Sequence, residues 1–171
     1  MSHGMYKEDG YLTGLQSKDE FINRTKDYAE SGYLCSEAVL LATSDLLEIR
    51  SEIIPAIASG FGAGMGRHGT VCGAITGGII GLGLRFGRKE KPSGEDRDAK
   101  SVYWYSAELL SRFRERHGTI LCSEITNCNL MEPDGLKKYR EENLWKTTCR
   151  DVIASVSELV HEILVSRSGH L

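Results

Sequence analysis

The sequence lacks an apolar segment long enough to cross a membrane, a secretory signal and an excess of positive charge. Its longest apolar run, residues 71–84, is shorter than the roughly 20 residues of a membrane span and is rich in glycine. The first residues contain no apolar core of a signal peptide, and the net charge of −3 gives no basis for binding a polyanion. We therefore expect a cytoplasmic protein that binds neither a membrane nor nucleic acid.

Closely spaced cysteine pairs are also missing. The five cysteines form no Cys-x-x-Cys and no Cys-x-x-Cys-His motif, which argues against a thioredoxin-type site and against covalent haem attachment. Lasting disulfides are unusual in the cytoplasm. The cysteines therefore indicate a metal site, redox chemistry or plain burial.

No segment has the pattern of a β-strand, and the hydrophobic periodicity is helical almost throughout. We predict an all-α fold, a compact single-domain bundle over residues 17–171 after a flexible N-terminal segment of residues 1–16. A surface loop is expected over residues 89–96. The helices are expected over residues 17–31, 35–46, 52–59, 71–86, 97–116, 136–144 and 149–166, with a short helical turn at Cys122.

The helix expected over residues 71–86 is unusually rich in glycine, with Gly73, Gly77, Gly78, Gly81 and Gly83. Each glycine costs roughly 1 kcal/mol relative to alanine inside a helix. A sequence carries this cost when backbones must approach closely. We therefore expect this helix to be central and tightly crossed by its neighbours, and it favours a homodimer.

Four of the cysteines fall where a helix is predicted to begin. Thr70 and Thr148 are candidate N-caps just before two of them, and the tetrapeptide Leu-Cys-Ser-Glu surrounds the other two. A helix N-terminus has unpaired N–H groups and a partial positive charge, which lower the pKa of a thiol. We therefore expect thiolate-favouring sites at Cys35, Cys72, Cys122 and Cys149.

The residues leave three uses of these cysteines open. Four thiolates that meet at one end of a bundle can hold an iron–sulfur cluster or zinc. Two of them can instead form a reversible disulfide, or all four can simply be small buried residues. The fifth cysteine, Cys128, does not clearly begin a helix. We expect it to be a bystander, with a resolving thiol or a substitute ligand as the alternative.

A glycine-rich loop precedes Cys72. Residues 64–69 match G-x-G-x-x-G, but no strand precedes them, so the dinucleotide-binding context is missing. We expect the loop to wrap N–H groups around Cys72, with Arg67 or His68 adding positive charge. The candidate cofactor-binding residues are Gly64, Gly66, Arg67, Gly69 and Gly73.

Cys35, the block of residues 60–77, Cys122 and Cys149 together resemble the C_GCAxxG_C_C family, over about residues 29–160. Members of that family are small bacterial and archaeal proteins described as candidates for redox activity, without a settled substrate. The resemblance implies that Cys35, Cys72, Cys122 and Cys149 are the functional residues. Cys128 lies outside the family pattern.

We therefore expect a redox-active cysteine protein, an oxidoreductase if it is an enzyme, whose four cysteines converge to bind an iron–sulfur cluster or another metal. Zinc is the second choice of metal. The alternatives are a metal-free thiol–disulfide oxidoreductase or redox sensor, and a structural zinc or non-catalytic binding module. The sequence does not identify the redox partner protein.

Overall fold

The computed structural model of the protein describes residues 17–90 and 102–166, and within these ranges it contains helices and no β-strand. This confirms the all-α prediction. The predicted segment 1–16, most of the predicted loop 89–96 and the start of the helix predicted from residue 97 lie outside the described residues. The elements are α1 (Lys18–Glu30), α2 (Cys35–Leu46), the 3₁₀-helix η1 (Ala56–Phe61), α3 (Gly62–Met65), α4 (Gly73–Phe86), α5 (Val102–His117), α6 (Cys122–Thr126), α7 (Pro133–Glu141), the π-helical turn η2 (Trp145–Cys149) and α8 (Arg150–Ser166).

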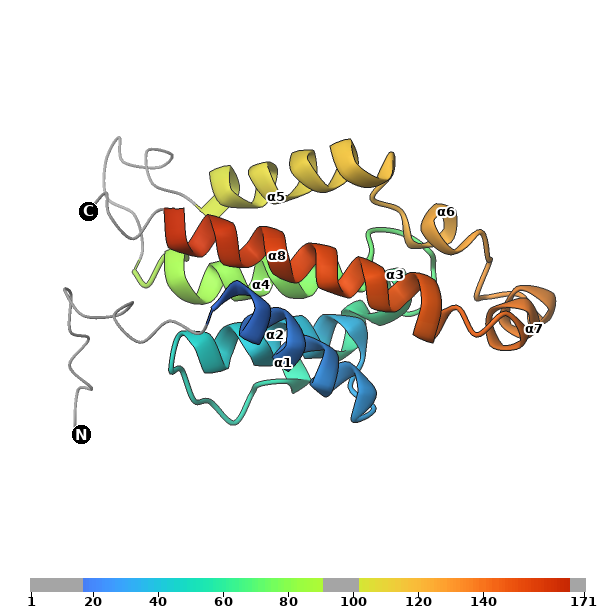
Figure 1. Cartoon of the computed structure of the whole chain (residues 1–171), viewed down its shortest axis with the longest axis horizontal. Helices are drawn as coiled ribbons and strands as arrows, with labels where there is room; N and C mark the ends of the chain where they lie inside the picture. Colours follow the sequence, from blue (N-terminus) through green and yellow to red (C-terminus); the bar gives the residue numbers. More distant parts are fainter. Residues whose placement is uncertain (1–16, 91–101, 167–171) are drawn as a thin grey trace.

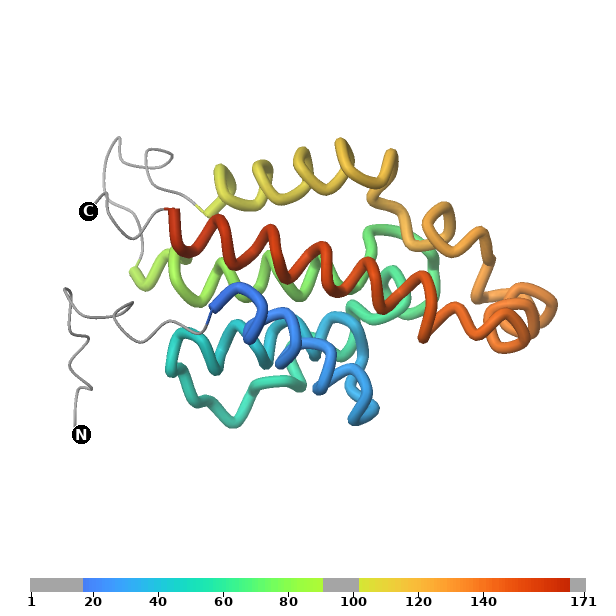
Figure 2. Tube along the Cα trace, in the orientation of Figure 1, coloured from blue at the N-terminus to red at the C-terminus, as the bar shows by residue number. Residues whose placement is uncertain are grey.

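The long helices lie side by side along the long axis of the molecule (Figure 1). Helix α8 runs between α5 on one side and α1 and α2 on the other, over α4 (Figure 2). Helices α2, α4 and α8 all begin at the same end, where the short helices α3, α6 and α7 gather (Figure 1). The fold thus collects several helix starts and connecting loops at one end of the bundle.

Helix α4 is the central helix, as predicted, because it packs against α2, α5 and α8. A Cβ added at Gly77 would lie 2.2 Å from the carbonyl oxygen of Ser36 in α2, and one added at Gly81 would lie 2.8 Å from Thr43 Cγ2. Glycine therefore lets α2 and α4 pack with their backbones in contact. Since these close approaches lie within one chain, the homodimer stays a prediction.

The apolar faces of the long helices meet in one core. Phe21 of α1, Val39 of α2, Leu82 of α4, Phe113 of α5 and Val156 of α8 are among its fully buried side chains. None of the described helices is long and apolar enough to cross a membrane.

Surface ion pairs connect three of the helices around this core. Glu158 of α8 accepts hydrogen bonds from Lys18 of α1, at 2.9 Å, and from Arg116 of α5, at 2.7 Å. Such exposed pairs contribute little individually to stability, and here they link α1 and α5 to α8.

Candidate cysteine site

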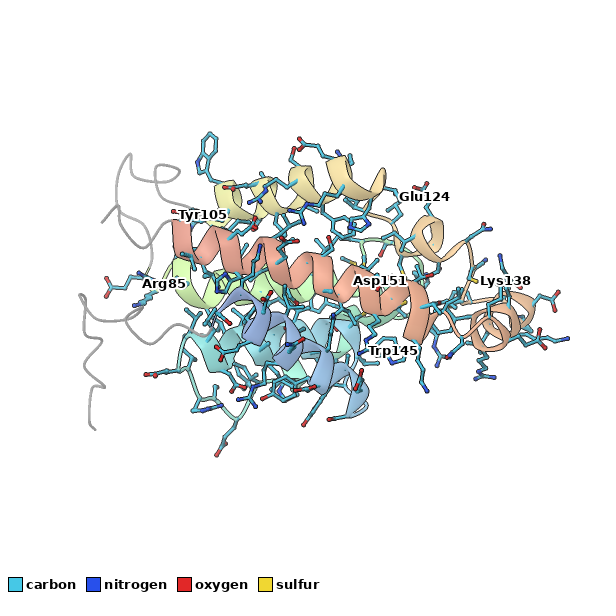
Figure 3. The ribbon with its side chains drawn as sticks, viewed as in Figure 1. Arg85, Tyr105, Glu124, Lys138, Trp145 and Asp151 are labelled. Atoms are coloured by element: carbon cyan, nitrogen blue, oxygen red, sulfur yellow. The ribbon has the colours of Figure 1, made fainter. Side chains whose placement is uncertain are left out.

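The four cysteines singled out by the sequence line one cavity at the end of the bundle where α2, α4 and α8 begin. The cavity has a volume of about 370 Å³ and is also lined by Tyr139. Trp145, another lining residue, lies at this end of the molecule, beside the start of α8 (Figure 3). The lining cysteines are Cys35, Cys72, Cys122 and Cys149.

Cys35 is the first residue of α2, as predicted, and its sulfur faces α4. Glu37 accepts a hydrogen bond from the N–H of Leu34, at 2.9 Å, and so caps this helix start. The N–H groups of Ala63 and Ala74 approach the Cys35 sulfur and favour its thiolate. Burial is the larger effect, however, and it raises the pKa of the Cys35 thiol.

Cys72 is itself the N-cap residue of α4. The helix was predicted to begin at Val71 with Thr70 as its cap, and that assignment is wrong, because the Thr70 hydroxyl donates to the carbonyl of Gly64 instead. Burial raises the pKa of the Cys72 thiol well above its usual value, and Cys35 and Cys122 raise it further through their charges.

Cys72 and Cys122 are held together by the backbone. The N–H of Cys72 donates to the carbonyl of Ile120 at 2.9 Å, and the N–H of Cys122 donates to the carbonyl of Thr70 at 2.7 Å. These two bonds form an isolated antiparallel bridge between Val71 and Leu121. The segment before α4 and the segment before α6 therefore bring two distant cysteines to one wall of the cavity.

Cys149 does not begin a helix, so this prediction is wrong. Its N–H already donates to the carbonyl of Leu144, five residues earlier, at 2.8 Å. It ends the π-helical turn that runs into α8. Such turns occur mostly as single-turn bulges and are frequent at functional sites. Here the turn aims the Cys149 side chain at the cavity.

Tyr139 contacts Cys149, a contact that no motif in the sequence predicts. Its hydroxyl is hydrogen-bonded to Cys149 Sγ at 3.3 Å. This bond favours the Cys149 thiolate, but burial outweighs it and raises the pKa of the Cys149 thiol to about 11. Burial likewise raises the pKa of the Tyr139 hydroxyl, with the nearby Cys149 adding to the effect.

The expectation of lowered thiol pKa values is wrong at all four positions. The pKa of Cys122 shows this most clearly, since burial raises it to about 12 and the charges of Cys35 and Cys149 add to the increase. Helix N–H groups do favour a thiolate. In this cavity, however, burial raises the thiol pKa values more than the helix N–H groups lower them. Each thiolate loses its hydration and is repelled by the neighbouring thiolates.

The glycine-rich loop forms a left-handed turn. Ala63, Gly64, Met65, Gly66 and Arg67 have φ values of 53°, 70°, 61°, 62° and 73°. A left-handed conformation costs roughly 1–2 kcal/mol for each residue that is not glycine. Strain of this kind persists only where the surrounding structure imposes it, and it is concentrated at functional sites.

The predicted cofactor-binding residues have different neighbours. A Cβ added at Gly64 would lie 2.7 Å from Cys122 Cβ, and one added at Gly69 would lie 2.7 Å from Ser123 Cβ, so both pack against α6. Gly66 has nothing within 4 Å of an added Cβ. The N–H of Ala63, the residue just before this loop, reaches the sulfur of Cys35. The N–H groups at Cys72 come from α4 itself.

Three further residues from the sequence analysis can be placed. Arg67 lines the cavity, and His68 does not. Cys128 is buried outside the cavity in a small apolar cluster with Leu130 and Leu144. Its charge would raise the pKa of Cys122 and of Cys149, so it lies near the site without lining it.

The described residues contain no group of three or more cysteine, histidine or carboxylate side chains placed to hold a single metal ion. The four cysteine sulfurs therefore surround a common space without forming a compact ligand set.

Comparison with known proteins identifies the family. A family model described as "Putative redox-active protein (C_GCAxxG_C_C)" matches residues 33–163. No significant match is found among curated proteins or among solved structures. The family match includes the left-handed loop and all four cysteines of the cavity. Because it covers well over half of the chain, the protein belongs to the C_GCAxxG_C_C family.

Proposed function

We propose that this protein transfers electrons through an iron–sulfur cluster held by Cys35, Cys72, Cys122 and Cys149. The observation that carries the proposal is that these four cysteines, from four separate elements, line one cavity. An all-cysteine donor set of this kind is the usual ligand set of [2Fe–2S] and [4Fe–4S] clusters. The cluster would supply one-electron oxidation and reduction.

The fit of the donor set favours a cluster over a single ion. The sulfurs surround a space of about 370 Å³, and no three of the described ligand-type side chains are placed around a single ion. A cluster contains several irons, so it spreads its thiolate ligands more widely than one ion does. Zinc requires a compact tetrahedron, which these cysteines do not form, so zinc is the weaker choice.

The raised pKa values mean that a metal must displace protons to bind these cysteines. Without a metal, burial and mutual repulsion keep these thiols protonated at neutral pH, since the pKa is about 12 for Cys122 and about 11 for Cys149. Metal ligation requires thiolates and releases their protons. Positive charge in the cavity would remove the repulsion that raises these pKa values.

The groups around the cysteines support this proposal. The N–H groups of Ala63 and Ala74 at Cys35, and the hydroxyl of Tyr139 at Cys149, would donate hydrogen bonds to ligand sulfurs. Such hydrogen bonds tune the reduction potential of a cluster. The apolar walls would limit the access of water.

A second candidate function is metal-free thiol–disulfide chemistry, with Cys35 and Cys72 as the reacting pair. The effect of the Cys35 charge on the pKa of Cys72 favours it, because this effect places the two thiols near one another. Their raised pKa values count against it, since the thiolate is the attacking form and little of it exists at neutral pH. For this reason we rank it second.

The test is the iron and acid-labile sulfide content of protein expressed and purified without oxygen, together with its visible spectrum. We expect iron and sulfide in comparable amounts and a broad visible absorption. Cys72→Ser should lose most of both. Cys128→Ser is the matched control, because Cys128 is also buried but does not line the cavity, and it should keep them.

Other outcomes separate the alternatives. Equal iron in Cys72→Ser and in the unmodified protein would contradict ligation by this cavity. Zinc alone would assign the cysteines a structural role. Colourless, metal-free protein that forms a Cys35–Cys72 disulfide on mild oxidation, detected by peptide mass spectrometry, would establish the second candidate.

A further inference from the structure

The charged side chains that line the cysteine cavity are both positive. Arg67 and Arg140 line the cavity, and no aspartate or glutamate among the described residues does so. The other lining residues are apolar, aromatic, small, hydroxyl-bearing or thiol-bearing. Two arginines without a carboxylate partner among the lining residues offer a binding site for an anion.

Both guanidinium groups are available to a ligand. Neither takes part in an ion pair or a side-chain hydrogen bond with another described residue. Most other described arginines are already engaged: Arg24, Arg50, Arg112, Arg116 and Arg150 are paired with carboxylates. Arg67 and Arg140 are both exposed, whereas Cys35, Cys72 and Cys122 are buried. The cations thus lie at the mouth of the cavity, and these thiols lie deeper.

The two arginines come from different parts of the fold. Arg67 ends the left-handed turn, with φ of 73°, and Arg140 belongs to the last turn of α7. Both line the same cavity, although they are far apart in sequence. The strained turn therefore has a consequence beyond its packing on α6, since it brings a cation to the mouth.

Between the mouth and the thiols the walls are apolar. Ile125, Leu130, Leu136 and Trp145 line the cavity. Its volume of about 370 Å³ lies within the range of small-molecule sites, roughly 300–1,000 Å³. Guanidinium groups bind carboxylates and other oxyanions through charge-assisted hydrogen bonds.

We propose that the mouth of this cavity binds a small organic acid. Its carboxylate contacts Arg67 and Arg140, and its apolar body lies along the wall formed by Leu136 and Trp145, pointing toward the thiols. The site goes beyond the proposed electron transfer, because it uses the two arginines and the apolar wall and requires no bound iron. It assigns a ligand class to the cavity.

The test is calorimetric titration of metal-free, reduced protein with four probes. Benzoate and hexanoate combine a carboxylate with an aromatic or an alkyl body. Sulfate has the oxyanion without the body, and benzyl alcohol has the body without the charge. We expect benzoate or hexanoate to bind more tightly than sulfate or benzyl alcohol, and we expect the binding to weaken with added salt because the arginines are exposed.

Substitutions then locate the site. Arg67→Gln and Arg140→Gln should each weaken binding of the acid by about tenfold or more, the usual effect of losing a hydrogen bond between charged groups. Arg140→Lys should retain more binding than Arg140→Gln, because it keeps the charge. Arg114→Gln is the matched control, an exposed arginine of α5 that does not line the cavity, and it should bind normally. Equal unfolding midpoints would show that the variants are folded.

Three results would overturn this proposal. They are the absence of binding by both acids in the millimolar range, equal binding of benzyl alcohol and benzoate, and acid binding that neither arginine substitution weakens. An outcome in which sulfate binds as tightly as the organic acids would reduce the site to a simple oxyanion site and also reject the apolar wall. Because these titrations use metal-free protein, their failure leaves the iron and sulfide measurement unaffected, and the reverse also holds.

Discussion

The sulfur of Cys35 lies against the bare backbone of Gly73, since a Cβ added at Gly73 would lie 2.5 Å from Cys35 Sγ. The same added atom would lie 2.9 Å from the carbonyl oxygen of Phe61, so backbone as well as side chain closes this space. The contact joins the first turns of α2 and α4. It also lets the N–H of Ala74 reach the Cys35 sulfur.

Gly73→Ala should destabilise the protein because the new methyl group has no room. Overpacking of this kind typically costs about 1–3 kcal/mol. Urea unfolding would measure the loss of free energy. We also expect a lower iron and sulfide content, because Cys35 must move away from the cavity to make space.

Gly83→Ala, in the same helix, is the control. An added Cβ at Gly83 has no atom within 4 Å, so the substitution should leave stability unchanged or raise it by up to about 1 kcal/mol through helix propensity. Similar losses in the two variants would show that the Cys35–Gly73 contact is not the cause.

Alanine substitutions at Gly64 and Gly66 form a second matched pair, which separates the cost of backbone strain from the cost of steric crowding. Both have positive φ, of 70° and 62°, so alanine at either position should cost about 1–2 kcal/mol in backbone strain. An added Cβ at Gly64 would also lie 2.7 Å from Cys122 Cβ and 2.8 Å from the backbone nitrogen of Thr70. Gly64→Ala should therefore lose at least about 1 kcal/mol more than Gly66→Ala in chemical unfolding.

A smaller difference between the two would mean that the loop can move away from α6. Thiol accessibility at Cys122 offers an independent measurement, because only the Gly64 substitution should expose it to alkylation.

Met65→Gly should stabilise the protein. Met65 has φ of 61° and is 40% exposed, so glycine relieves the left-handed strain with little loss of packing. The gain should be about 0.5–1 kcal/mol, since the greater freedom of glycine in the unfolded chain offsets part of it. A rise in the melting temperature would measure it.

Met65→Ala separates the two causes, because it removes the long side chain but keeps the strained backbone. It should not stabilise the protein. Equal stabilisation by both substitutions would assign the gain to the loss of the exposed methionine side chain.

Acid should remove the contribution of Glu158 to stability. The hydrogen bonds from Lys18 and then from Arg116 are the main causes that lower the pKa of the Glu158 carboxyl. A carboxyl with a lowered pKa in the folded state stabilises the protein above its unfolded pKa of about 4.3 and loses that contribution as the pH falls through the folded value. Unmodified protein should therefore exceed Glu158→Gln in stability above about pH 5, by less than about 1 kcal/mol, and the difference should shrink as the pH falls through the lowered pKa of Glu158.

Glu115→Gln provides the comparison for this titration. Glu115 is exposed on α5 and forms no ion pair with the other described residues, so its substitution should leave the pH profile of stability unchanged. Thermal unfolding at several pH values would record both variants. A constant difference between Glu158→Gln and the unmodified protein at every pH would assign its effect to packing instead.

Much of the fold follows from local sequence. Ser17 and Glu20 form the predicted capping box of α1, and the glycines of α4 predict a central helix. The two Leu-Cys-Ser-Glu segments begin α2 and α6 with their cysteines in the first position. These features depend on neighbours three or four residues away, which the sequence displays directly.

The cysteine site depends on contacts between residues far apart in the sequence. Predictions made from neighbouring residues were therefore partly wrong at this site. Cys149 looks like a helix start after Thr148, but its N–H is already bonded to Leu144 in a π-helical turn. The left-handed conformation of Ala63, Met65 and Arg67 could not be predicted, because these residue types ordinarily avoid it. Only packing against α6 and α2 makes it the accessible conformation.

By itself the sequence determined the helical class and the central position of α4. It also singled out the four cysteines that line the cavity. The tertiary structure decided that these cysteines share one cavity, that Tyr139 is hydrogen-bonded to Cys149, and that Arg67 and Arg140 both line this cavity. It also reversed the predicted direction of the thiol pKa values. The physical reason is range, because capping and periodicity act within a turn of helix, whereas burial and charge repulsion are set by groups that the fold brings together from far along the chain.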